Sequence, residues 1–126
     1  MSVPADRKYL ETHEWHQLNG WVVTIGITQT AADELTDITY VQLPKIGTAV
    51  YAGTPFGEIE SVKATAELVS GVDGKVVAVN ETLSANPGQI NHDPYEAGWM
   101  IKVKISDPAS MNKMLSAEDY EKGTGH

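Results

Sequence analysis

Two segments far apart in the chain place an apolar residue at every second position, and this pattern constrains the fold more than any other feature. Residues 21–27 read Trp-Val-Val-Thr-Ile-Gly-Ile, and residues 99–105 read Trp-Met-Ile-Lys-Val-Lys-Ile. Successive side chains of a β-strand point to opposite faces, so Val23, Ile25 and Ile27 would share one face. Both segments therefore predict half-buried β-strands.

More strands are predicted between these two segments. Residues 38–43 are rich in β-branched and aromatic residues and stop at Pro44, which cannot donate to a sheet. Short apolar runs separated by glycines, a pattern typical of strands with tight turns, follow near Val50, Ile59, Leu68 and Val76 to Val79. The segments 47–50 and 74–77 each open with a glycine, which suggests a pseudo-repeated pair of strand units.

Short helices are predicted outside the strands. Residues 28–35 replace β-branched residues with alanine and glutamate, and Thr28 is a suitable N-cap. Residues 107–115 begin with an Asp-Pro pair, an N-cap followed by a first-turn proline, and continue with apolar residues at helical spacing. Ser116 can start another helix, and residues 123–126 are expected to form a frayed tail.

The composition limits the class of protein. The 126 residues suffice for one domain over residues 1–126, with its core at about residues 20–105. The chain has no cysteine, so redox sulfur chemistry would have to come from an attached group. With 9 Lys and Arg against 17 Asp and Glu, the formal charge of -8 argues against nucleic acid and favours partners with basic docking surfaces.

The sequence contains no recognisable targeting or membrane-spanning segment. The first nine residues, MSVPADRKY, lack an apolar signal core. No stretch approaches the ~20 apolar residues that a helix needs to cross a bilayer. We therefore expect a soluble cytoplasmic protein that does not bind membranes.

Few residues suggest catalysis. His13 and His16 could bind a metal ion only with a third or fourth ligand, so we expect no metal site and interpret these histidines as surface or loop residues. The motifs of phosphate-binding loops, dinucleotide sites and nucleophile elbows are missing. Glu58 and Glu60 would share one face of a strand, where solvated carboxylates are expected rather than an acid–base pair. The sequence thus predicts a protein that is not an enzyme.

Lys63 is distinguished by its context. Extended segments flank residues 61–64, so Lys63 is predicted at a hairpin tip, where a modifying enzyme can reach its side chain. Glu60 lies three residues before Lys63 and Glu67 four residues after it. Ion pairs between these side chains at an exposed site would contribute less than about 1 kcal/mol. Stability therefore explains this arrangement poorly.

A series of short motifs runs through nearly the whole chain. In order, they are Thr12-His-Glu-Trp15, Gly26-Ile-Thr28, Tyr40-Val41, Leu43-Pro44, Glu60-Ser-Val-Lys-Ala64, Gly74, Val79-Asn80, Ile90-Asn91, Asp93-Pro-Tyr95 and Gly98-Trp99. Each motif is weak alone, but together, in this order and spacing, they are highly specific. The chain resembles the H proteins of the glycine cleavage system. It departs from their pattern at Thr36, where glycine is usual, and at Gln29 and Gln42, where acidic residues are common.

The resemblance implies a fold and a cofactor. The implied fold is mainly β, a flattened barrel-sandwich hybrid of the lipoyl/biotinyl type with two antiparallel sheets and short peripheral helices, including one near the C-terminus. The implied cofactor is lipoate, joined to Lys63 by an amide that removes the lysine charge. Its dithiolane would supply the redox pair that the chain lacks.

The resemblance also implies a role and a set of partners. A pyridoxal-phosphate glycine decarboxylase would load the arm with an aminomethyl group, and a tetrahydrofolate-dependent aminomethyltransferase would unload it. Dihydrolipoamide dehydrogenase would then reoxidise the dithiol, and a lipoylating enzyme would attach the arm. A carrier that presents one arm to several enzymes is expected to be monomeric.

Several acidic residues are candidates for functions around the arm. The protonated amine of a loaded arm would benefit from shelter, and we expect Glu14 and Glu67, with the Thr12 hydroxyl nearby, to dock it. Glu34, on the predicted short helix, is a further candidate. The alternative interpretation treats these residues as ordinary surface acids. Glu60 is expected to help the lipoylating enzyme choose its lysine over Lys45 or Lys75.

Three alternatives remain open on the sequence alone. The first is a lipoyl or biotinyl module of another multienzyme complex, although such modules typically present Asp-Lys-Ala or Met-Lys-Met where this chain has Val62-Lys63-Ala64. The second is an H-like protein that relays lipoate to other carriers. The third is an unmodified β interaction domain, which would keep an unaltered mass in cells that make lipoate.

Overall fold

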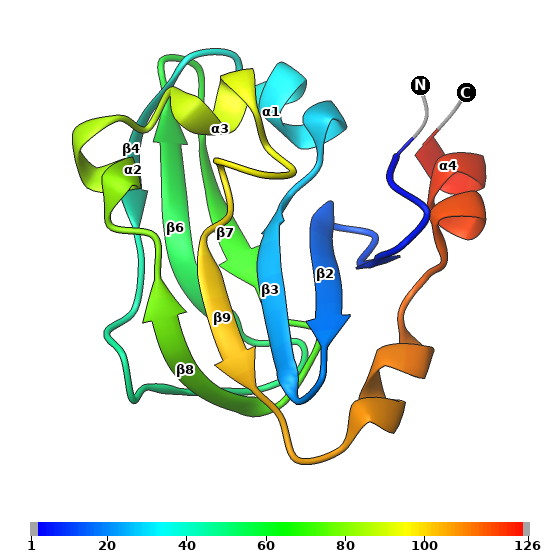
Figure 1. Ribbon diagram of the computed structural model, residues 1–126. Coiled ribbons are helices and arrows are strands. Elements are labelled where there is room, and N and C mark those ends of the chain that lie inside the picture. The colour runs from blue at the N-terminus through cyan, green and yellow to red at the C-terminus, as the bar shows by residue number, and fades with distance from the viewer. Residues whose placement is uncertain (1–2, 125–126) are drawn as a thin grey trace.

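The protein is built around two antiparallel β-sheets, in a computed structural model that describes residues 3–124 (Figure 1). The larger sheet has the strand order β1 (Lys8–Tyr9), β2 (Glu14–Asn19), β3 (Val22–Ile27), β9 (Ile101–Lys104), β8 (Gly74–Val79) and β5 (Ala49–Val50). The smaller sheet has the order β4 (Ile38–Gln42), β6 (Pro55–Ser61) and β7 (Thr65–Val69). The predicted mainly β fold with two antiparallel sheets is confirmed.

Short helices surround the sheets in two groups (Figure 1). One group, at the upper end of the sheets in the figure, consists of α1 (Gln29–Leu35), α2 (Thr82–Ala85) and α3 (Gln89–His92). The other group lies beside β1 and β2 and consists of the 3₁₀ helix η1 (Pro108–Lys113) and α4 (Ala117–Thr124). Within residues 3–124, no helix is both long and apolar enough to cross a membrane.

The alternation along β3 and β9 places one face of each strand in the core. Val23, Ile25, Ile101 and Val103 are fully buried and belong to one hydrophobic cluster. Ile27, at the end of β3, joins a second cluster with α1 and the smaller sheet. Each fully buried Val or Ile side chain contributes about 1.5–3 kcal/mol to folding. A register shift by one residue would expose the whole face, so this burial fixes the strand register.

The strand predicted over residues 99–105 is shorter than expected. Strict alternation over residues 99–105 would place Met100 on the outward face with Lys102 and Lys104, but Met100 is fully buried in the second cluster. Its N–H donates to the Ile25 carbonyl, and its own carbonyl accepts from the Asn80 N–H. At this end of the larger sheet, α2 and α3 cover the chain, so both faces of the segment are buried and the alternation ends.

The two glycine-led segments, 47–50 and 74–77, supply strands that pair with each other. They correspond to β5 and to the first part of β8, and Val50 lies opposite Gly74. A Cβ atom at Gly74 would lie 2.3 Å from the carbonyl oxygen of Lys104 on β9. Glycine is therefore needed where β8 and β9 approach this closely.

The helix predicted over residues 28–35 is α1. Thr28 is its N-cap, as predicted, because the hydroxyl accepts a hydrogen bond from the Ala31 N–H. Thr36 ends the helix with φ 61° and ψ −147°, a region that strongly favours glycine. A threonine in this conformation costs about 1–3 kcal/mol, which agrees with the expectation of glycine at this position.

The single helix predicted over residues 107–115 is only partly correct. The expected Asp107 cap is present, and its side chain accepts from the Ala109 N–H, but the helix is the shorter 3₁₀ element η1. Leu115 instead pairs with Tyr9 in an isolated β-bridge, through hydrogen bonds in both directions. This pairing pulls the backbone out of the helical conformation after residue 113.

The helix predicted to start at Ser116 is confirmed as α4, and the Ser116 hydroxyl accepts from the Asp119 N–H. The prediction of a frayed tail from residue 123 is wrong for residues 123 and 124, which belong to α4. Residues 125 and 126 of that predicted tail lie outside the described residues. Tyr120 is 1% exposed and stacks on Tyr9 with 4.9 Å between ring centroids, which anchors α4 to the sheet.

Several of the sequence motifs meet around Trp15. A Cβ atom at Gly26 would lie 2.6 Å from the Trp15 indole, so only glycine fits beneath the ring. The indole N–H donates to the Pro94 carbonyl at 3.0 Å, and the Arg7 guanidinium lies 4.4 Å from the ring centroid. Trp15 belongs to a third cluster of buried residues, completed by Val3, Tyr9 and Tyr120, which lies outside residues 20–105.

Candidate functional site

The turn between β6 and β7 is a tight hairpin tip at the upper end of the smaller sheet (Figure 1). The Ser61 hydroxyl accepts from the N–H groups of Lys63 (3.1 Å) and Ala64 (3.0 Å) and donates to the Ala64 carbonyl (3.1 Å). The Val62 N–H donates to the Asp37 carbonyl, which ties the tip to the start of β4. These bonds satisfy the N–H groups of residues 62–64 and restrain the conformation of the tip.

Lys63 is exposed at this tip, as predicted. Its Nζ donates to the backbone carbonyl of Glu34 on α1 at 3.3 Å. No ion pair within residues 3–124 joins Lys63 to Glu60 or Glu67. The suggested ion pairs with these two glutamates are therefore not formed, and the lysine points toward α1.

Glu60 lies near the end of β6, opposite Tyr40 on β4 and Thr65 on β7. Both Glu60 and Tyr40 are exposed, so the two side chains and Val62, which is 70% exposed, form an accessible surface beside the lysine. Glu58, two residues earlier, is also exposed, as expected for a solvated carboxylate on that face of the strand.

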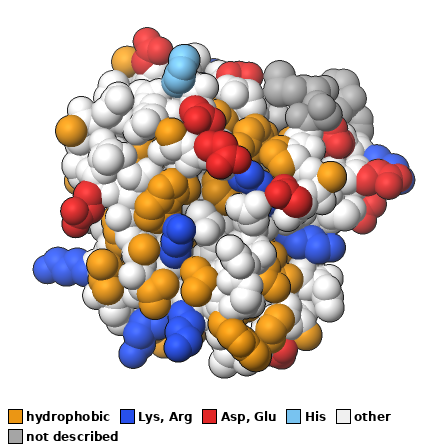
Figure 2. Space-filling model, in the orientation of Figure 1, with side chains coloured by type: hydrophobic (Ala, Val, Ile, Leu, Met, Phe, Trp, Pro, Cys, Tyr) orange, Lys and Arg blue, Asp and Glu red, His pale blue; other side chains and the backbone are white. Residues whose placement is uncertain are grey.

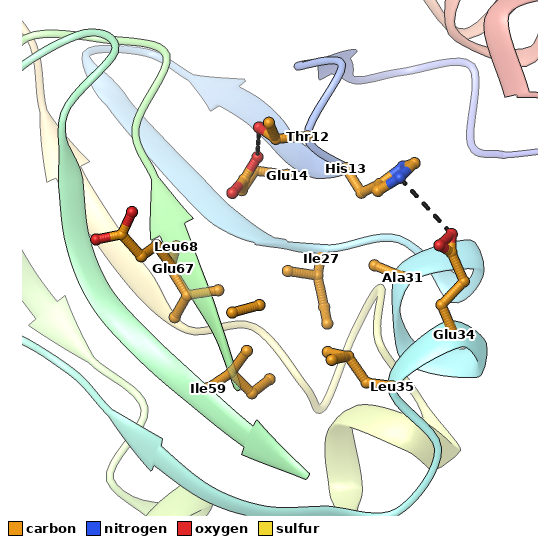
Figure 3. Close-up of a pocket in the computed structure, with 11 residues that line it drawn as sticks. Thr12, His13, Glu14, Ile27, Ala31, Glu34, Leu35, Ile59, Glu67 and Leu68 are labelled. Carbon is orange, nitrogen blue, oxygen red and sulfur yellow. Dashed lines mark hydrogen bonds and ion pairs between the residues drawn. The ribbon is translucent and has the colours of Figure 1, made fainter. Parts of the chain in front are cut away.

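A pocket of about 150 Å³ lies between α1, the start of β2 and the smaller sheet (Figure 3). All four residues predicted to dock a loaded arm line it, namely Thr12, Glu14, Glu34 and Glu67. The sequence separates these residues by up to 55 positions, and only the fold brings them together. Glu60 and Lys63 do not line this pocket, and its small volume suits the end of a chain rather than a nucleotide.

Glu14 is 1% exposed, so its interpretation as an ordinary surface acid is wrong. One carboxylate oxygen accepts from the Thr12 hydroxyl and the other from the Val69 N–H at 2.8 Å. Burial raises the pKa of the Glu14 carboxyl above its usual range, and these two hydrogen bonds oppose the rise. A buried carboxyl of this kind favours a cationic ligand, which would compensate its lost hydration.

The other two carboxylates lie at the edges of the pocket. Glu67 and Glu34 are both exposed and come from β7 and α1, respectively. In Figure 3, Glu67 and Glu14 lie on the β7 side and Glu34 on the α1 side, with apolar side chains such as Ile27 and Leu35 between them. The pocket thus combines an apolar lining with negative charge on two sides.

His13 also lines the pocket, and the sequence did not indicate this role. It adopts φ 82°, an uncommon conformation for a non-glycine residue. Its Nδ1 lies 2.5 Å from the Tyr120 hydroxyl, and its Nε2 lies 3.8 Å from a Glu34 carboxylate oxygen. The Tyr120 hydroxyl also contacts the Thr28 hydroxyl at 2.8 Å. Helix α4 is therefore connected through His13 to the rim of the pocket.

His16 is fully buried, so its interpretation as a surface or loop residue is wrong. It lies on β2 and its Nε2 accepts from the Gly71 N–H at 3.0 Å. Burial lowers the pKa of His16 to about 3, which keeps the ring neutral at physiological pH. Among the described residues, no group of three or more His, Cys, Asp or Glu side chains is arranged to hold a metal ion.

The two antiparallel sheets with short peripheral helices form a fold of the lipoyl-carrier type, with an exposed lysine at a hairpin tip and a small acid-lined pocket near it. The family model described as Glycine cleavage H-protein matches residues 7–126. The chain belongs to this family of glycine cleavage system H proteins.

Known relatives agree with this assignment over almost the whole chain. Glycine cleavage system H proteins of Bacillus mycoides (strain KBAB4) and Bacillus cereus (strain AH820) are 49% identical to it over 124 residues, covering 98% of this chain and 98% of each relative. The crystal structure of a glycine cleavage system H protein from Mycobacterium marinum has a TM-score of 0.90 and 35% identity, and covers 98% of this chain and 100% of its own.

The general function of the protein follows from its family. The protein is a lipoylated shuttle of the glycine cleavage system, a carrier component of that system. This confirms the function that the sequence motifs implied and decides against a module of another multienzyme complex.

Proposed function

We propose that Lys63 is the residue that carries lipoate. The observation that supports this most directly is the rigid hairpin tip, where the Ser61 hydroxyl fixes the backbone and leaves the Lys63 side chain exposed. A lipoylating enzyme needs a reachable amine in a defined backbone conformation, and this tip supplies both.

The residues around Lys63 fit the arm. Within residues 3–124, the Lys63 ammonium donates to a backbone carbonyl and forms no ion pair, so acylation breaks no ion pair there. The chain has no cysteine, and bound lipoate supplies a dithiol redox pair that can carry an aminomethyl group. What the protein itself contributes is attachment, orientation and shelter.

We assign the pocket to the cationic amine of a loaded arm. Glu14 would hold the ammonium at the buried side, because pairing with a cation offsets the desolvation of its carboxylate. The Thr12 hydroxyl keeps the Glu14 carboxylate oriented. Glu67 and Glu34, at the exposed edges, would draw the cation toward the opening and contribute less, because water screens their charges.

Glu60 is assigned to recognition by the lipoylating enzyme. It is exposed and lies beside Val62 and Tyr40 on the same accessible end as Lys63, away from the pocket lining. A Glu60→Lys variant should be lipoylated more slowly than wild type, while the matched Glu58→Lys variant should be lipoylated at the normal rate. Equal rates for both variants would remove this assignment.

The finer roles follow from the shuttle function. The carrier would take the aminomethyl group from a pyridoxal-phosphate glycine decarboxylase to a tetrahydrofolate-dependent aminomethyltransferase, and dihydrolipoamide dehydrogenase would reoxidise it. We further propose that residues 1–126 form one lipoyl-carrier domain, that the protein acts as a cytoplasmic monomer, and that it performs no catalysis of its own.

Intact mass measurement tests the attachment site. The protein is produced in lipoate-supplied cells with the lipoylating enzyme, and the modified peptide is located by mapping. The lipoyl mass increment should map to Lys63, disappear in Lys63→Arg and persist in the matched Lys75→Arg control. An unmodified Lys63, under conditions that modify a known carrier, would refute the proposal.

A further inference from the structure

The outward side of the larger sheet carries what we call the basic face, made of Val22, Lys75, Val77, Lys102 and Lys104. In the strand register, Lys104 on β9 lies opposite both Lys75 on β8 and Val22 on β3. Lys102 is two residues from Lys104 and therefore points to the same side. Figure 2 looks onto this side of the sheet and shows lysine or arginine side chains with apolar side chains between them in its lower half.

The lysines of the basic face are close to one another without acidic partners. Two like charges directly opposite each other on neighbouring strands destabilise a sheet. Nevertheless, Lys75 and Lys104 occupy such a pair, and both are exposed. Between residues 3 and 124, no ion pair includes Lys75, Lys102 or Lys104.

The nearest acidic residues along the chain are engaged elsewhere. Asp73, next to β8, accepts from the Ala52 N–H at 2.7 Å. Asp107, after β9, caps η1 by accepting from the Ala109 N–H. Between residues 3 and 124, neither carboxylate forms an ion pair with a lysine of the basic face.

The concentration of lysines contrasts with the rest of the chain. The protein has only 9 basic residues against 17 acidic ones, yet three of the basic residues share this face. On the face seen in Figure 2, the acidic side chains lie mainly in the upper half and at the side. Protection of an exposed sheet edge does not explain the lysines on β9, because β9 lies between β3 and β8.

The basic face and the lipoyl lysine lie at opposite ends of the fold. Lys75 is at the start of β8 and Lys104 at the end of β9, where both strands reach the lower end of the sheet in Figure 1. The β6–β7 turn with Lys63 is at the upper end. A contact on the basic face therefore leaves the arm and its pocket accessible.

We propose that the basic face binds an acidic surface on one of the enzymes that this carrier serves. The three ammonium groups would pair with carboxylates of that enzyme, while Val22 and Val77 supply apolar contact between them. The contact holds the carrier by the end remote from Lys63 and leaves the arm free to move. This inference rests on the proposed shuttle function for its choice of partners.

The test measures binding without the arm. Lys63→Ala protein is titrated with the glycine decarboxylase, the aminomethyltransferase and the dihydrolipoamide dehydrogenase of the same genome. Reversal of all three charges (Lys75→Glu, Lys102→Glu, Lys104→Glu) should weaken binding to one enzyme by at least about tenfold. Raising the salt concentration from about 50 to about 300 mM should weaken wild-type binding in the same direction and have less effect on the variant.

A matched control separates the face from net charge. The variant Lys8→Glu, Lys113→Glu, Lys122→Glu changes the formal charge equally but lies outside the basic face, and its binding should change by less than about twofold. A neutral version with glutamine at positions 75, 102 and 104 should lose less affinity than the charge reversal. It also keeps the test informative if the reversed variant folds poorly.

Other outcomes would overturn the proposal. If charge reversal leaves binding to all three enzymes unchanged, or if the control variant loses as much affinity, the basic face is an ordinary solvated sheet surface and the proposal is wrong. A wild-type dimer that dissociates in the variant, seen by analytical ultracentrifugation, would make a second copy the occupant. Lysine-dependent binding to phosphatidylserine vesicles, without an effect on the enzymes, would make a membrane the occupant. A failure of lipoylation at Lys63 would refute the proposed attachment site but leave the arm-free binding result intact.

Discussion

The acidic pocket and the basic face carry charges of opposite sign. The more important difference is that the pocket holds a buried charge, whereas the charges of the basic face are exposed to water. Glu14 in the pocket is 1% exposed, and its carboxyl has a raised pKa. Lys75 and Lys104 on the basic face are exposed to water. A buried charge is costly and needs specific partners, whereas an exposed charge is inexpensive and is screened by salt. The pocket is therefore suited to holding a small cation, and the face to attracting a large partner.

The largest expected difference between buried and exposed groups is in the response to acid. His16 has its pKa lowered to about 3 by burial, from 6.5. The unfolded chain takes up a proton near pH 6.5 and the folded chain only near pH 3, so stability is complete above pH 6.5 and falls as the pH decreases toward 3. Between pH 7 and pH 4 this loss should reach about 3–4 kcal/mol. Urea unfolding between pH 7 and 4 measures it.

The matched variants for this experiment are His16→Gln and His92→Gln. The His16→Gln protein should have a flatter dependence of unfolding free energy on pH in that range, whatever its stability at pH 7. His92 is exposed, so His92→Gln should keep the wild-type slope. Identical slopes for all three proteins would mean that burial of His16 does not control acid stability.

The next effect concerns the cargo in the pocket. Glu14→Gln keeps an acceptor for the Val69 N–H and a polar group for Thr12 but removes the buried charge. Release of the aminomethyl group into water should become about 10- to 100-fold faster, since a buried ion pair is lost. The matched exposed variant Glu67→Gln should change it by no more than about threefold. Decay of loaded protein, followed by intact mass, measures both, and similar rates would contradict the assignment of Glu14.

A smaller effect is expected from the contacts that connect α4 with the pocket. Tyr120→Phe removes the hydroxyl that contacts His13 and Thr28 and should lower the unfolding free energy by about 1–2 kcal/mol. Tyr40 is 51% exposed, so Tyr40→Phe is the control and should leave stability unchanged. Urea titration compares the two variants. If Tyr120→Phe were as stable as Tyr40→Phe, the network would contribute nothing to the pocket rim.

The smallest effect is expected on the basic face. Lys104→Thr removes one of two like charges that lie directly opposite each other, and it should raise the unfolding free energy by about 0.2–0.5 kcal/mol at low salt. The gain should disappear at about 1 M salt, where exposed charges are screened. If the gain in unfolding free energy persists at high salt, the strand propensity of threonine explains it rather than the removed charge. The control is Lys113→Thr, which replaces an exposed lysine on η1.

Local patterns in the sequence predicted the larger part of the fold. The strand over residues 21–27, the Thr28 cap and the exposed hairpin lysine at position 63 were all confirmed. These features depend on neighbours a few residues apart, through the period of the side chains and the chemistry of caps and turns. The ordered motifs also predicted the protein family, because they combine many such local requirements.

The errors have a common cause in long-range pairing. Met100 is buried because other elements cover both sides of its segment, and the helix predicted over residues 107–115 ends early because Leu115 pairs with Tyr9. His16 was misjudged because the residues that cover it are remote in sequence. Local periodicity carries no information about such partners.

The sequence by itself determined the strands, the turns and the position of Lys63 at a hairpin tip, because each depends on backbone preferences over a few residues. Only the tertiary structure decided which charges are buried and which are grouped. The pocket beside Glu14 is lined by residues from β3, β6, β7 and α1. His13 meets Tyr120 across 107 positions, and Lys75 faces Lys104 through strand pairing. Hydration and electrostatic interaction depend on distance in space, and folding alone sets that distance.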